Sequence, residues 1–165
     1  MNEDKPVDFM ARFASSEPFE RVFREGMGLV EETADYLDGP GRKDARLLDR
    51  EGAVAYATES MRLTTRLMQL ASWLLLQRAM QAGEITQDDA QAEKRRISLE
   101  EVGNVAPLVG SHVIPEGLSL LIARSLRLHE RVLTLDRSFA SPAKAQAGEN
   151  PVSQQLDQLA KAFGG

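Results

Sequence analysis

Residues 59–79 (ESMRLTTRLMQLASWLLLQRA) contain neither proline nor glycine, and this run constrains the fold more than any other part of the chain. It predicts one long helix whose second half is apolar on nearly every side. A helix that is apolar all round must be covered all round. Because a small monomer covers such a helix with difficulty, the run predicts a bundle centre, a dimer seam, or both. The residues that we assign to this core or dimer seam are Leu67, Leu70, Trp73 and Leu74.

The composition favours helices and excludes several functional classes. Leu, Ala, Glu, Arg and Gln are abundant, whereas Val, Ile and Thr are sparse. The net charge of −5 gives no general electrostatic case for binding nucleic acid or an anionic membrane. The chain has no cysteine, which excludes disulfides, thiolate metal sites and a cysteine nucleophile. The most apolar window is too short to span a bilayer, so we expect a cytoplasmic protein with neither a membrane nor a nucleic-acid partner.

Helix signals divide most of the chain into long segments. A Ser-Ser-Glu-Pro start signal precedes a first helix that ends at Gly39-Pro40-Gly41. A second helix begins between residues 42 and 50 and ends before Gly83. Thr86 caps a short polar helix that continues to about Arg96, and a last long helix covers residues 115–138. The apolar stripe that we expect on the first helix comprises Phe19, Val22, Phe23, Met27, Val30, Ala34 and Leu37.

These segments predict an all-α fold: an antiparallel three-helix bundle with a short additional helix and a flexible C-terminal tail. We place the bundle domain at residues 1–138 and the tail at residues 139–165, whose composition cannot bury enough surface to order itself. At the end of the tail Leu156, Leu159 and Phe163 lie on one helical face. An isolated helix of that length is marginal in water. The tail is therefore either a tethered protein-binding motif or a frayed terminus.

No motif for catalysis, cofactors or metals is present. His112 and His129 lack a second ligand at helical spacing, which favours structural or surface histidines. No Walker loop, dinucleotide fingerprint or nucleophile elbow occurs. We therefore predict a non-enzyme with no catalytic, cofactor-binding or metal-binding residue.

Charged residues on the helices are the remaining candidates for protein binding. Acidic residues crowd the C-terminal half of the first helix, where they oppose the helix dipole, and form either a docking face for a basic partner or a solvated face. Arginines on the last helix form a ridge that pairs with the acidic helix within a dimer or binds a partner. These residues are Glu31, Glu32 and Asp35, with Asp38, on the first helix and Arg124, Arg127 and Arg131 on the last. On the central helix, Glu59 and Arg62 are spaced for a structural ion pair.

Residues 59–79, together with 23–32 (FREGMGLVEE) and 36–39 (YLDG), resemble the alphaproteobacterial regulator of CtrA degradation, a family first catalogued as a domain of unknown function. The resemblance extends from about Phe9 to Leu135. It implies a homodimeric three-helix bundle that acts as a non-enzymatic adaptor for the ClpX–ClpP protease. In that family the protease is already primed by a single-domain response regulator. Cell-cycle substrates are then delivered directly or through a further adaptor that binds cyclic di-GMP, and recruitment to a cell pole is an open expectation.

Two other functions remain as alternatives. The runner-up is a structural or scaffolding homodimer without a role in proteolysis. A DNA-binding regulator has only the Arg124–Arg131 ridge in its favour, because the net charge is negative and no basic recognition helix is evident.

Overall fold

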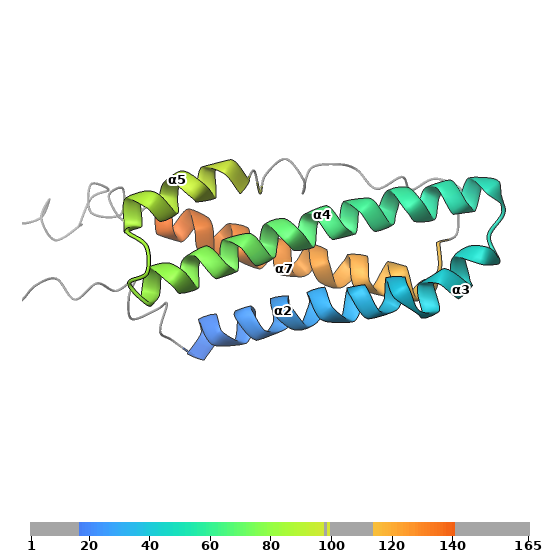
Figure 1. Ribbon diagram of the computed structural model, residues 1–165, viewed down its shortest axis with the longest axis horizontal. Coiled ribbons are helices and arrows are strands. Elements are labelled where there is room, and N and C mark those ends of the chain that lie inside the picture. The colour runs from blue at the N-terminus through green and yellow to red at the C-terminus, as the bar shows by residue number, and fades with distance from the viewer. Residues whose placement is uncertain (1–16, 98, 100–113, 141–165) are drawn as a thin grey trace, which may run out of the picture. The chain divides into compact units, whose positions relative to one another are not determined.

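The computed structural model describes residues 17–97, 99 and 114–140, and the helices named below lie within these ranges. The described residues divide into two units between Leu133 and Thr134, and the contacts below belong to the first. Helix α2 (Glu17–Asp38) runs antiparallel to α4 (Arg50–Gln81) and to α7 (Glu116–Ala140), as Figure 1 shows. The predicted helical bundle with a short additional helix is confirmed. The predicted tail, including Leu156, Leu159 and Phe163, lies almost wholly outside the described residues.

Helix α3 (Pro40–Arg46) is a short element that the sequence patterns did not predict. Gly39 ends α2, but Pro40 then begins a new helix, because proline suits the first helical turn. At this corner a Cβ on Gly41 would lie 2.5 Å from the Tyr56 hydroxyl and 2.7 Å from the Tyr36 carbonyl oxygen. The Tyr36 hydroxyl donates a hydrogen bond to Asp44 at 3.0 Å, which holds α3 against α2.

The ends of α4 and the start of α5 (Gln87–Ile97) follow their sequence signals. Asp49 caps α4 by accepting a hydrogen bond from the Gly52 amide at 2.7 Å. Gly83 follows α4 with φ of 72°, and the Glu84 amide bonds back to the Ala79 carbonyl at 3.0 Å. Thr86 accepts a hydrogen bond from the Asp89 amide, as a cap should. The predicted boundaries around Gly83 and Thr86 are therefore confirmed.

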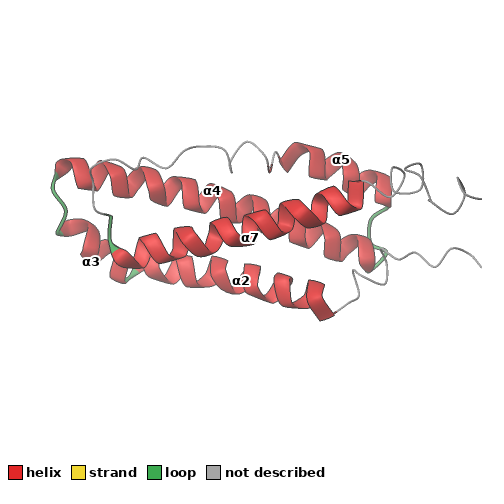
Figure 2. Ribbon diagram, turned by 180° about the vertical axis from the view of Figure 1, so that it is seen from behind, coloured by secondary structure: helices red, strands yellow, loops and turns green. Residues whose placement is uncertain are grey.

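The core lies between α2, α4 and α7, with α5 closing one end. Lys94 of α5 donates a hydrogen bond to Gln77 of α4 at 2.6 Å and lies over the Trp73 ring. Helix α7 runs parallel to α4, as the colours of Figure 1 show, and it lies in front of α4 when the bundle is seen from behind (Figure 2). The largest fully buried apolar side chains are Phe19, Leu29, Leu63, Leu70, Trp73, Leu74, Leu118, Leu128 and Val132.

Candidate protein-interaction surfaces

In the middle of α4 the charged residues lie on the side that faces the bundle, which is the reverse of an ordinary surface helix. Between residues 53 and 76 the charged residues are Glu59, Arg62 and Arg66. Glu59 and Arg66 are buried, and Arg62 pairs with Glu59 at 3.0 Å. The predicted structural ion pair is thus confirmed. Arg66 reaches across to α7 and donates a hydrogen bond to the Ser125 hydroxyl at 2.9 Å. The outward face of this segment consequently carries no charge.

That outward face is uncharged, and among the described residues its large apolar side chains are exposed beside hydroxyl residues such as Thr65 and Ser72. We define the α4 stripe as Val54, Met61, Met68 and Leu75, which are seven residues apart and 53–71% exposed. This spacing brings side chains to one side of a helix every two turns, as in helices that pack along one another. The expectation that this helix is covered all round is therefore not met within one chain. An apolar face of this length is typical of a protein interface.

The four residues assigned to the core or dimer seam all occupy the inward side of α4. Leu67, Leu70, Trp73 and Leu74 are each no more than 3% exposed. Near the end of the same helix, the Arg78 guanidinium lies 4.4 Å from the centre of the Phe23 ring of α2. The bundle of the single chain already buries these four side chains, so the outward stripe is the part of α4 left for contact with another molecule.

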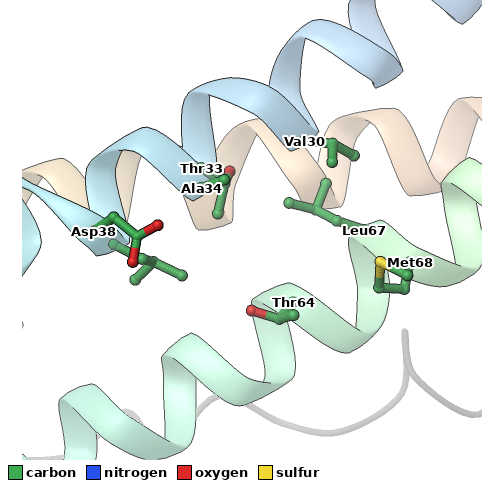
Figure 3. Close-up of a pocket in the computed structure, with 8 residues that line it drawn as sticks. Val30, Thr33, Ala34, Asp38, Thr64, Leu67 and Met68 are labelled. Atoms are coloured by element: carbon green, nitrogen blue, oxygen red, sulfur yellow. The ribbon is translucent and has the colours of Figure 1, made fainter.

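A groove of about 310 Å³ opens between α2 and α4 (Figure 3). Its walls are largely apolar, and Met68 forms the edge that it shares with the α4 stripe. Thr33 is 3% exposed, and its hydroxyl finds no hydrogen-bond partner among the described residues. The residues that line the groove, which we call the α2–α4 groove, are Val30, Thr33, Ala34, Leu37, Asp38, Thr64, Leu67 and Met68.

The observed apolar stripe of α2 differs from the predicted one in the second half of the helix. Phe19, Val22 and Phe23 enter the core as expected. Farther along, Leu29 and Thr33 take the buried positions, and the side of α2 facing the core moves round by one residue. The expected core residues of this half line the α2–α4 groove instead, and they are Val30, Ala34 and Leu37.

The acidic and basic residues that we predicted as binding surfaces meet each other within one chain. Glu32 accepts a hydrogen bond from Arg124 at 2.7 Å, and Arg131 bonds to Glu25. The hydrogen bond from Arg124, reinforced by its charge, holds the pKa of Glu32 below its ordinary value. The same hydrogen bond raises the pKa of Arg124. These pairs tie α2 to α7, so dimerisation is not needed to bring the acidic helix and the arginine ridge together.

The other residues of these two sets remain open for contact. Glu31, Asp35 and Arg127 are exposed and have no ion-pair partner among the described residues. The helical spacing of Glu31, Asp35 and Asp38 places them on one face of α2, next to the α2–α4 groove that Asp38 lines. Asp38 pairs with Arg42 at 3.3 Å, and both side chains are largely exposed to solvent. The acidic set therefore has two parts, one pairing with α7 and one bordering the groove.

The structure assigns other expected features to local structural roles. His129 is buried, and its Nε2 lies 2.6 Å from the Leu99 carbonyl oxygen, so this histidine joins α7 to the chain after α5. His112 lies outside the described residues. Within the described part of the chain no group of His, Asp and Glu is arranged to hold a metal ion. In the same residues, no helix combines the length and hydrophobicity required to span a bilayer.

Comparison with known proteins places the chain in a family. The model of the family described as "Protein of unknown function (DUF1465)" matches residues 10–163. The chain belongs to this family. Its fold is similar to the crystal structure of RcdA from Caulobacter crescentus CB15, with 52% sequence identity and a TM-score of 0.65. The match covers 78% of this chain and 95% of that one, and it confirms the resemblance to the family of the regulator of CtrA degradation. No curated protein matches the chain.

Some surface residues were missed by sequence reasoning although a signal was present. The seven-residue repeat of Val54, Met61, Met68 and Leu75 is visible in the sequence. It escaped notice because the whole run from residue 67 to 76 is apolar, which hides the side that faces outward. Thr33 carried no pattern of its own, since a single threonine on a helix is unremarkable.

Proposed function

We propose that this chain is a non-enzymatic adaptor that helps to deliver cell-cycle regulatory proteins to the ClpX–ClpP protease. The observation that carries the proposal is the 52% identity to RcdA over most of both chains. Its partners would be the protease primed by a response regulator, protein substrates, and a further adaptor that binds cyclic di-GMP. The charge-free outer face of α4 and the α2–α4 groove support a role in protein contact rather than catalysis.

The mechanism that we propose is tethering. An adaptor that holds a substrate near the unfoldase raises the local substrate concentration and so accelerates degradation without touching bond chemistry. The bundle would bind one partner, and the tail, with Leu156, Leu159 and Phe163, would bind a second. Such an arrangement works in the cytoplasm, where protease and substrates are both present.

A degradation assay tests this role. Purified ClpX–ClpP, the response regulator and a cell-cycle substrate are combined with and without the chain, and substrate loss is followed over time. We expect the full chain to accelerate degradation and the chain lacking residues 139–165 to bind the substrate without accelerating it. Equal rates with and without the full chain, with every other adaptor present, would refute the adaptor role. Equal rates for full and shortened chains would refute only the role of the tail.

We also propose that the chain forms a homodimer through the α4 stripe. Four large apolar side chains on one uncharged helix face leave water when two such faces pack together. Met61→Glu and Leu75→Glu place charges on the stripe at exposed positions, so the fold should tolerate them. Sedimentation should show a dimer for the parent chain and a monomer for these variants, with Gln87→Glu on α5 as a matched control. A monomeric parent chain at micromolar concentration would contradict this proposal.

The alternative function is a scaffolding homodimer without a role in proteolysis, and the α4 stripe alone would account for it. A pull-down of the unfoldase and its response regulator with the parent chain separates the two. Retention of neither protein, together with an intact dimer, would favour the scaffold.

A further inference from the structure

We propose that the α2–α4 groove is the docking site for an amphipathic helical segment of a partner protein, with aliphatic side chains in the groove and lysine or arginine along one edge. The inference rests on the proposed adaptor function, because it names the chemistry of the segment that the bundle would hold. It places that contact on a surface of the bundle that is separate from the ion pairs between α2 and α7.

The walls of the groove are suited to aliphatic anchors. Val30 of α2 faces Leu67 and Met68 of α4, and the side chain of Ala34 between them is small (Figure 3). Leu37 adds a further aliphatic side chain to the lining. A volume of about 310 Å³ lies at the lower end of the range for small-molecule sites, roughly 300–1,000 Å³. The described lining offers few convergent polar groups, which argues for protein side chains rather than a cofactor. Methionine at the edge adapts its shape to different anchors.

The hydroxyls on the two walls of the groove differ in their hydrogen bonding, and that of Thr33 is buried. A buried hydroxyl without a hydrogen bond is unfavourable, and most such groups in proteins are paired. Neighbouring Thr64, on the opposite wall, already donates its hydroxyl hydrogen to the Ser60 carbonyl at 2.9 Å, whereas the Thr33 hydroxyl has no partner among the described residues. Because the Thr33 oxygen is itself buried, contact with a docked segment would come mainly from the aliphatic side chains around it.

The two edges of the groove differ in charge, and this difference selects the segment. The α2 edge carries Glu31 and Asp35, both exposed and without an ion-pair partner in the described part of the chain. The α4 edge is the uncharged stripe around Met68. A helix with an apolar face and cations on one side matches both edges in one orientation, so charge fixes the direction of docking as well as the class of partner.

The α4 stripe and the α2–α4 groove share Met68, but each also has residues of its own, which allow the two surfaces to be tested separately. Ala34 belongs to the groove alone and is exposed, so Ala34→Arg fills the groove without disturbing the core. Leu75 belongs to the stripe alone. Thr65→Arg is the matched control for Ala34→Arg, because Thr65 is an exposed residue of α4 outside the groove.

The test uses the full chain and a fluorescent amphipathic helical peptide with leucines on one face and lysines along one edge. Fluorescence anisotropy should show micromolar binding that weakens roughly tenfold or more in Ala34→Arg and stays unchanged in Thr65→Arg. The double variant Glu31→Lys and Asp35→Lys should weaken binding of the lysine-edged peptide. It should strengthen binding of a peptide that carries glutamates along the same edge. Undetectable binding, or equal loss in Ala34→Arg and Thr65→Arg, overturns the proposal.

A second copy of this chain is the other possible occupant, and sedimentation distinguishes it. If Ala34→Arg dissociates a dimer, the groove holds the second copy and the proposal fails. The peptide assay contains no protease, so its result is independent of the adaptor role. Peptide binding without accelerated degradation refutes the adaptor role alone, whereas accelerated degradation without peptide binding refutes the groove.

Discussion

Arg66 of α4 donates a hydrogen bond to the Ser125 hydroxyl of α7 at 2.9 Å, and both side chains are buried. This contact inverts the usual arrangement, because α4 holds a guanidinium against the core while Met61 and Met68 face outward. Burial lowers the pKa of Arg66, which shows that the interior opposes its charge even though Glu59 favours it. The middle of the helix therefore has its charges on a largely apolar inner side and an uncharged outer side.

Replacing Arg66 with methionine should leave the free energy of unfolding unchanged or raise it by about 1–2 kcal/mol, because the cost of burying the charge disappears. Glu59 keeps Arg62, and Ser125 keeps its hydrogen bond to the Ile122 carbonyl at 2.8 Å. Ser125→Ala should instead destabilise by about 1–3 kcal/mol, since it leaves the Arg66 guanidinium without this acceptor. Urea unfolding measures the stability of both variants. A large loss of stability in Arg66→Met would show that the buried charge is favourable overall.

Gly41→Ala and Gly28→Ala should change stability in opposite directions. A Cβ on Gly41 would meet the Tyr36 backbone oxygen at 2.7 Å, which cannot move aside easily, so we expect a loss of about 1–3 kcal/mol. Gly28 lies exposed within α2, and a Cβ added there would have nothing within 4 Å, so alanine should gain about 0.5–1 kcal/mol. Thermal unfolding followed by circular dichroism compares the two. Equal effects would contradict the close approach at Gly41.

The corner around Tyr36 predicts a loss of stability in alkali. Burial, together with the hydrogen bond to Asp44, raises the pKa of Tyr36 to about 12. The folded state thus binds the phenolic proton more tightly than the unfolded chain, whose ordinary pKa is 10.0. This stabilisation is complete below pH 10 and is lost as the pH rises toward 12. Urea unfolding at a series of pH values should show that the free energy of unfolding falls less steeply with pH in Tyr36→Phe than in the parent chain. An identical pH dependence would refute the assignment to Tyr36.

Glu32→Gln should lower the free energy of unfolding by roughly 0.2–1 kcal/mol at neutral pH, because it weakens an exposed pair with Arg124. Since the folded pKa of Glu32 lies below its ordinary value of 4.5, the contribution is present above that value and is lost as the pH falls through the folded pKa. High salt should reduce the difference. Glu31→Gln is the matched control, because Glu31 has no such partner among the described residues, and an equal effect there would contradict the pairing.

Local sequence patterns predict helices α2, α4, α5 and α7, most of their ends and the family. Capping by Thr86, the stop at Gly83 and the helical spacing of apolar residues depend on neighbours within a few positions, so a local pattern predicts them. The run from residue 59 to 79 required burial and also carried the family resemblance. Helix α3 escaped prediction because its start at Pro40 follows so closely on the end of α2.

The tertiary structure decided which side of each helix faces the core. A uniformly apolar run such as residues 67–76 gives no preferred side, and only packing against α2, α5 and α7 leaves Met68 and Leu75 outside while Trp73 and Leu74 go inside. The same packing turns α2 so that Thr33 is buried and Ala34 faces the groove. Pairing of Arg124 with Glu32 likewise joins residues far apart in the sequence. Helical spacing fixes which residues share a face, but the competition among neighbouring helices fixes which face is covered.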